Sequence, residues 1–158
     1  MKRLFLLAIL VSCFVLSWGV PAYGQDCSGA DRLTRHIYNP DRLVPTEKGC
    51  ITVTGKIIAK VPEKDGDYHY RMKLDPGQGS GLINSKNNTK KHKRFLIFEP
   101  ICIGKVTQKS AKRACRGFHQ QITLPNKGDR VSVTGLHILD KEHGWLEIYP
   151  VTKITVLR

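Results

Sequence analysis

The C-terminal stretch 126–157 constrains the fold of this chain more than any other part of it. Over Asp129–Leu139 apolar and polar side chains alternate, which is the period-two pattern of a half-buried β-strand. Gly135 interrupts this alternation, as a bulge or a sharp bend requires. Pro150 divides a second extended segment, Gly144–Leu157. The end of the chain therefore predicts two strands in succession.

Three earlier segments also have the composition of strands, so we expect an all-β domain with five of them. Cys50–Val61 is long and carries Gly55 near its middle, which suits a strand that bends to serve two sheets. Asp67–Asp75 alternates cleanly after an Asp-Gly turn, and Phe95–Glu99 is nearly all apolar. Val106–Arg116 is expected to form a short basic helix between strands three and four. In strand two, one face is expected to point inward (Tyr68, Tyr70, Met72, Leu74) and the other outward (Asp67, His69, Arg71, Lys73).

The N-terminus has the pattern of a signal peptide over Met1–Gly24. Basic residues precede an apolar run, and an Ala-x-Gly step ends it. An uncleaved anchor and a lipoprotein are alternatives, because the run is near the lower limit for a membrane span and contains Cys13. We expect cleavage, which would leave no stable membrane span and an exported protein, periplasmic or extracellular. The processed chain would consist of an N-terminal arm over 25–49 and one domain over 50–158.

Four cysteines follow the expected cleavage site, and an even number in an exported protein indicates two disulfides. Three connectivities are possible. We favour Cys27–Cys50, which would tie the arm to the first strand, and Cys102–Cys115, which would close a short loop. The chain has no Cys-x-x-Cys pair, so structural bridges are favoured over a zinc site.

The chain is strongly basic, with a formal net charge of +13. Such an excess favours an anionic partner such as nucleic acid, an acidic glycan or a cell-envelope polymer, although it also suits a solvated surface without a specific partner. Basic residues on strand two and in the Lys90–Arg94 run could form a cationic groove. Trp145 is either part of the core or an exposed stacking platform. The candidate ligand-binding residues are therefore Arg71, Lys73, Lys91, Arg94, His143, Trp145 and Glu147.

Two resemblances add to this interpretation. The order of three strands, a helix and two strands, together with the stretch GDRVSVTG, resembles an OB-fold barrel over about residues 48–158. The segments Asp65–His69 (DGDYH) and His143–Val151 (HGWLEIYPV) resemble motifs of small exported bacterial and archaeal proteins of unknown function. Those proteins usually have His where this chain has Tyr149. The first resemblance implies a ligand face on strands two and three, and the second implies no activity.

The polar residues of these motifs allow a second kind of function. Asp65, Asp67 and His69 could bind a divalent cation, although an ordinary turn would contain similar residues. His143 and Glu147 could share acid–base work with them if the two motifs meet in space. No nucleophile–base pair is evident, so we assign no catalytic residue and no cofactor beyond such a cation. We expect an exported binding module for an anionic polymer or ligand; the alternatives are a metal-dependent, nuclease-like hydrolase and a structural or partner-binding envelope protein.

Overall fold

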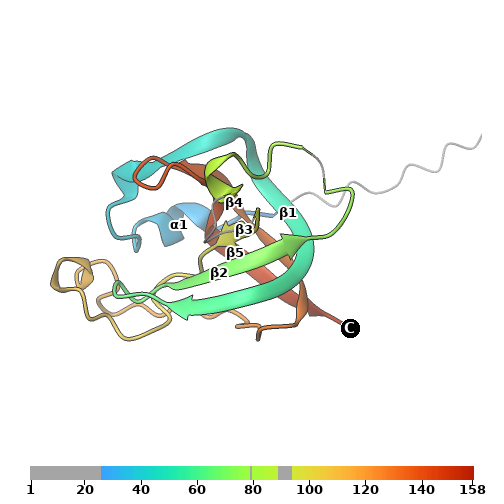
Figure 1. Ribbon diagram of the computed structural model, residues 1–158. Coiled ribbons are helices and arrows are strands. Elements are labelled where there is room, and N and C mark those ends of the chain that lie inside the picture. Colours follow the sequence, from blue (N-terminus) through green and yellow to red (C-terminus); the bar gives the residue numbers. More distant parts are fainter. Residues whose placement is uncertain (1–25, 79, 89–93) are drawn as a thin grey trace, which may run out of the picture.

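The computed structural model describes residues 26–78, 80–88 and 94–158, and the expected signal peptide lies outside them. Its main elements are five β-strands and one short helix, labelled in Figure 1. Short 3₁₀ turns connect several of these elements. The strands are β1 (Leu43–Pro62), β2 (Tyr68–Leu74), β3 (Leu96–Phe98), β4 (Arg130–Asp140) and β5 (Leu146–Leu157); the helix is α1 (Ala30–Thr34); and the 3₁₀ turns are Pro40–Arg42, Lys86–Asn88 and Lys109–Ala111.

The five strands form one sheet that closes on itself in the order β1-β2-β3-β5-β4. β3 and β5 run parallel, and the other neighbours run antiparallel. β1 curves around the sheet in Figure 1, because it pairs with β2 through one half and with β4 through the other. Two glycines allow the close approach of neighbouring strands: a Cβ at Gly55 would meet the Lys73 carbonyl, and one at Gly135 would lie 2.5 Å from the Pro150 carbonyl oxygen. The bulge expected at Gly135 is confirmed by a shift in register there.

The closed sheet buries two separate cores. Inward-facing side chains from all five strands form the first, among them Tyr70, Phe98 and Ile148. The second lies on the outside of the sheet, where Leu33 and Ile37 of the N-terminal arm pack on residues such as Tyr149. The arm thus covers part of the outward face, and the alternation of strand residues decides which of the two environments each side chain enters.

Both predicted disulfides, Cys27–Cys50 and Cys102–Cys115, are confirmed. The inward face of β2 is confirmed as well, since Tyr70 and Met72 are fully buried. On the opposite, outward face, two of the four residues are not exposed to solvent. Asp67 and His69 are only 2% and 7% exposed, because residues outside the sheet cover that face.

The expected helix over 106–116 is absent, and that segment contains only the 3₁₀ turn Lys109–Ala111. The backbone N–H groups of Thr107 and Gln108 donate instead to the carbonyl of Lys64 in the β1–β2 turn, which holds the segment as a loop. Within the described residues, the single α-helix, α1, lies in the N-terminal arm. β1 also begins seven residues before the expected Cys50, whereas β5 continues past Pro150 as expected. Within the described residues, no helix is long and apolar enough to cross a membrane.

Candidate functional site

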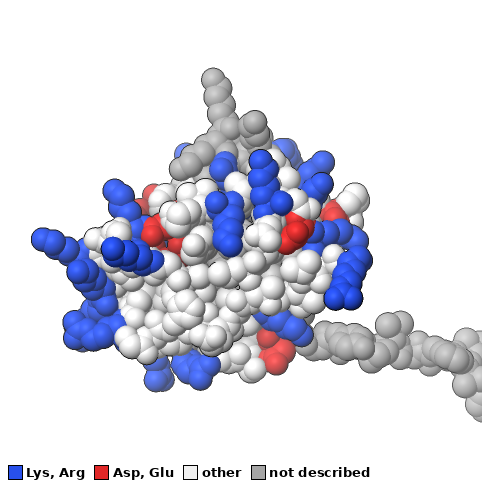
Figure 2. All heavy atoms as spheres, turned by 90° about the horizontal axis from the view of Figure 1, so that it is seen from below, with Lys and Arg blue, Asp and Glu red and all other residues white. Residues whose placement is uncertain are grey.

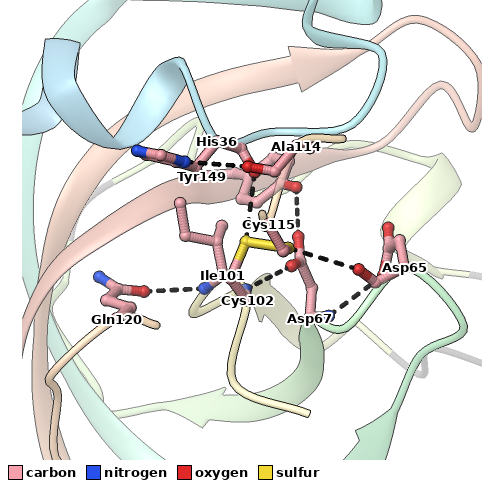
Figure 3. The surroundings of a disulfide bond; sticks show 9 residues. All are labelled: His36, Asp65, Asp67, Ile101, Cys102, Ala114, Cys115, Gln120 and Tyr149. Atoms are coloured by element: carbon pink, nitrogen blue, oxygen red, sulfur yellow. Dashed lines mark hydrogen bonds between the residues drawn. A yellow bond between two sulfur atoms is a disulfide. The ribbon is translucent and has the colours of Figure 1, made fainter. Parts of the chain in front are cut away.

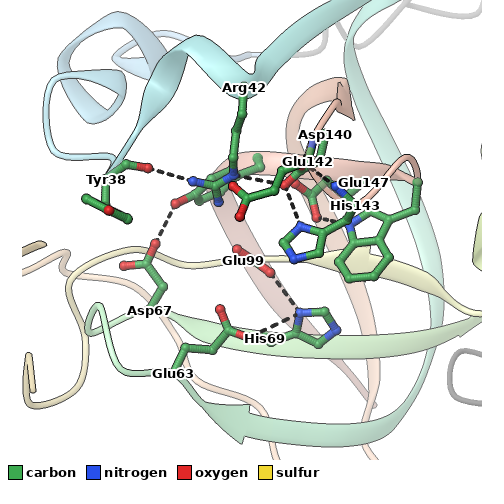
Figure 4. A network of polar contacts seen from close by, with 12 residues as sticks. Tyr38, Arg42, Glu63, Asp67, His69, Glu99, Asp140, Glu142, His143 and Glu147 are labelled. Atoms are coloured by element: carbon green, nitrogen blue, oxygen red, sulfur yellow. Dashed lines mark hydrogen bonds and ion pairs between the residues drawn. The ribbon is translucent and has the colours of Figure 1, made fainter. Parts of the chain in front are cut away.

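A cavity of about 390 Å³ lies against the outward face of β2 and the β4–β5 hairpin. Figure 4 shows its polar side chains converging from the N-terminal arm, the end of β1, β2, the residue after β3 and the β4–β5 hairpin. The two sequence motifs therefore meet in space, His69 from one and His143 with Trp145 from the other. The cavity is lined by Arg42, Val61, Glu63, His69, Arg71, Lys86, Glu99, Asp140, His143 and Trp145.

Strand alternation and one hairpin place these side chains. His69 and Arg71 occupy the outward positions of β2, opposite the inward Tyr70. Glu99 follows the buried strand β3 on the outward side, because Phe98 before it points into the core. The β4–β5 hairpin is closed by a hydrogen bond from the Gly144 N–H to the Asp140 carbonyl at 2.7 Å, and the positive φ of 77° at Gly144 suits glycine.

The floor of the cavity is a group of one imidazole and two carboxyls. His69 Nδ1 lies 2.8 Å from Oε1 of Glu99 and 3.7 Å from Oε1 of Glu63. Burial raises the pKa of Glu99 well above its usual value, and the nearby charge of Glu63 adds to the effect. Burial also raises the pKa of Glu63. Ligand atoms of these three residues all lie within 4.8 Å of one another, so the group could hold a metal ion.

A second polar group, centred on Asp140, forms the opposite wall. Its buried carboxylate accepts hydrogen bonds from Arg42 Nε at 2.9 Å and from the backbone N–H groups of Glu142 and His143 at 2.7 and 3.0 Å. His143 Nδ1 also lies 2.9 Å from Oδ2 of Asp140. Burial alone would raise the pKa of Asp140, but the hydrogen bonds from His143 and Arg42 outweigh it and hold the pKa below its usual value. Asp140 is therefore an anion that orients both the arginine and the imidazole.

Trp145 joins the two groups. One face of its indole stacks on the His143 ring at 4.2 Å between centroids, and the ring meets His69 edge to face at 5.9 Å. Its Nε1 donates a 2.8 Å hydrogen bond to Oε2 of Glu147. Glu147 is 1% exposed, and its Oε1 has no hydrogen-bond partner among the residues that the structure describes. Burial raises the pKa of Glu147 well above its usual value, and the nearby Glu99 contributes.

The structure places the other two predicted metal ligands elsewhere. Both carboxylate oxygens of Asp67 have partners next to the second disulfide, since Oδ1 accepts from the Cys102 N–H at 2.7 Å and Oδ2 from the Tyr149 hydroxyl at 2.5 Å (Figure 3). Burial raises the pKa of Asp67 to about 7, with a further contribution from the charge of Asp65. Asp65 accepts the Asp67 N–H within the turn. The structure thus groups His69 with Glu63 and Glu99 rather than with these two aspartates.

The predicted cationic residues take three different positions. Arg71 lines the cavity, whereas Lys73 lies further along β2 and is exposed. Lys73 is directly opposite Lys56 of β1, and Lys56 is in turn opposite Arg130 of β4. Arg94 lies at the edge of the described residues, where its N–H donates to the Asn87 carbonyl, and Lys91 lies outside them. Figure 2 shows one face of the molecule, on which lysine and arginine side chains far outnumber acidic ones.

The sequence interpretation did not select Arg42, Glu63, Glu99 or Asp140 as site residues. Glu99 could have been predicted, because a charged residue directly after an apolar strand is expected to point away from the core. Arg42 carried none, since only the folding of the arm over the sheet brings it to the cavity. No known protein family matches the chain, and no curated protein shows significant similarity to it.

Proposed function

We propose that this chain is an exported binding module of the OB-fold type, with an anionic polymer as its ligand. The ring order β1-β2-β3-β5-β4, with β3 parallel to β5, supports the OB assignment. Domains of this type bind extended ligands on the face of strands two and three. In this chain the outward face of β2 carries Arg71 and Lys73 and leads into the cavity.

The row of cations across three neighbouring strands carries this proposal. Lys73, Lys56 and Arg130 are successive register partners on β2, β1 and β4. Like charges directly opposite each other destabilise a sheet, and an anionic ligand across them would remove that repulsion. Among the residues that the structure describes, only Arg130 of this row forms an ion pair with an acidic side chain, that of Asp75 at 2.8 Å. Arg71 extends the positive potential from this row to the cavity mouth.

Fluorescence anisotropy of a labelled single-stranded oligonucleotide, titrated with the full chain, tests the proposal. We expect the logarithm of the binding constant to fall linearly with the logarithm of the salt concentration, with a slope of about −0.7 for each phosphate contacted. The double substitution Lys56→Glu and Lys73→Glu should weaken binding and flatten this slope. Its matched control, Lys109→Glu with Lys112→Glu, makes the same change of charge on the exposed 3₁₀ loop and should have a smaller effect.

Two results would contradict the proposal. One is equal weakening by the row variant and the loop variant, which would mean that only the net charge matters. The other is a flat titration with the oligonucleotide and also with an acidic glycan such as heparin, which would leave the third possibility, a structural or partner-binding envelope protein.

A metal-dependent hydrolase is a second candidate function, favoured by the pairing of His143 with Asp140 across the cavity from His69. A carboxylate-oriented imidazole is a common general base, and a cation held at the opposite wall could polarise a phosphoryl or carbonyl oxygen. In the same titration, hydrolysis would appear as a fall of anisotropy with time. A chelator would block that fall, whereas it would leave simple binding unchanged.

A further inference from the structure

We propose that Glu63, His69 and Glu99 form a binding site for one divalent transition-metal ion at the floor of the cavity. The site is inferred from the geometry of these side chains and does not depend on polymer binding. It differs from the set expected from the sequence, which combined His69 with Asp65 and Asp67.

The spacing of the three side chains fits a bound ion. Ligand atoms at about 2.0–2.2 Å from a common metal ion lie about 3.0–3.5 Å from one another. His69 Nδ1 is 2.8 Å from Glu99 Oε1 and 3.7 Å from Glu63 Oε1, so small side-chain rotations would bring all three atoms to those distances. Glu63 is the partner best able to move, because its side chain is 39% exposed.

A buried carboxylate oxygen near this group gives a second, independent indication. Glu147 projects from β5 into the same polar network (Figure 4), and its Oε1 is buried without a hydrogen-bond partner among the described residues. A buried polar atom without a partner is costly, and in native proteins it often marks an ion or water site. Arg42 does not supply the missing positive charge alone, because its Nε binds Asp140. A divalent cation beside Glu99 would offset the repulsion among these carboxyls.

The donor set indicates the class of ion. One imidazole nitrogen with two carboxylate oxygens suits Zn²⁺ and related first-row ions better than Ca²⁺, which prefers six to eight oxygen ligands. Three protein ligands facing an open cavity leave a coordination position for water or for an anionic group of a ligand, as in catalytic rather than structural zinc sites. Cys102 and Cys115 cannot contribute thiolates, because they are joined in a disulfide.

Isothermal titration of the EDTA-treated, dialysed full chain with ZnCl₂, without any polymer, tests this site. We expect one saturable site per chain. Glu63→Gln and His69→Ala should each weaken binding by at least about 10–100-fold, the loss that even indirect partners of a metal site produce. The matched control is Glu47→Gln, which removes an exposed carboxylate of β1 that does not line the cavity, and this variant should bind Zn²⁺ as the unmodified chain does.

Glu63→Gln is the decisive variant, because the 39% exposed side chain of Glu63 can be changed without opening the core. Circular dichroism of each variant identifies a loss of fold, and the absorption spectrum of bound Co²⁺ should change in Glu63→Gln if a ligand is lost. The proposal is overturned if the unmodified chain shows no saturable Zn²⁺ site, or if Glu63→Gln binds Zn²⁺ with unchanged affinity and an unchanged Co²⁺ spectrum. Failure of oligonucleotide binding would not affect either result.

Discussion

Asp140→Asn should destabilise the protein strongly, because Asp140 is the buried anion on which one wall of the cavity is built. The substitution keeps the shape of the side chain but removes the charge that faces Arg42, whose side chain is only 11% exposed. Removing one partner of a buried ion pair costs about 3–5 kcal/mol, since the other charge is left uncompensated. Because this pair borders a cavity, we expect the lower end, a loss of about 3 kcal/mol in the free energy of unfolding.

Urea unfolding followed by circular dichroism measures this loss at neutral pH. Arg130→Ala is the control, because it removes an ion pair whose arginine is 60% exposed, and solvent screening leaves such a pair with little effect on stability. The folded state holds the pKa of Asp140 below its usual 3.8, so the stabilisation is present above that value and is lost as the pH falls below it. A loss below about 1 kcal/mol at neutral pH, or a difference that persists undiminished in strong acid, would refute the reasoning.

Three further changes have defined outcomes. Gly135→Ala should lower the free energy of unfolding by about 1–3 kcal/mol or more in urea titrations, because its Cβ would lie 2.5 Å from the Ile148 side chain. Burial raises the pKa of Glu147, so the unmodified chain should lose stability as the pH rises and this carboxyl ionises, whereas the glutamine in Glu147→Gln cannot ionise. The free energy of unfolding of Glu147→Gln, measured between about pH 5 and 8, should therefore rise relative to that of the unmodified chain, and equal pH profiles would contradict this. Replacing Cys102 and Cys115 by serine opens a loop with a separation of 13 residues and should cost about 3 kcal/mol, seen as a lower midpoint of thermal unfolding.

Most of the sheet could be predicted from the sequence, because the sequence signals for strands and bends are local. The alternation in β2 and β4 and the glycines at 55 and 135 each describe a strand and its bend within a few residues. The disulfide pairing was also accessible, since each predicted bridge joins cysteines separated by 23 or 13 residues. The prediction for the basic segment over 106–116 was wrong, because its composition suits a helix while the backbone N–H groups of Thr107 and Gln108 donate to the Lys64 carbonyl.

The candidate site was less accessible because it depends on what covers the sheet. Alternation correctly placed His69 on the outward face of β2. An outward-facing side chain is exposed to solvent, however, only where no other part of the chain packs on that face. The arm and the β4–β5 hairpin cover that face, so His69 and Glu99 become buried partners across 30 residues of sequence. Arg42 reaches Asp140 across 98 residues. The periodicity of residues within one segment cannot predict contacts between residues so far apart in the sequence.

The covering of this face is also the strongest argument that the cavity has a function. A protein that needed only stability would place apolar side chains between the arm and the sheet, as it does around Leu33 and Tyr149. Beside that apolar core it instead buries Glu99 and Glu147, whose pKa values burial raises well above the usual range. Strongly perturbed carboxyls in a cleft are enriched at sites that bind or react, because their desolvation is costly to the fold. A cation bound by Glu63, His69 and Glu99 would compensate the desolvation of the buried carboxylates, so the fold would bind the cation more tightly. An anionic ligand passing Arg71 would then contact this cation at the cavity floor.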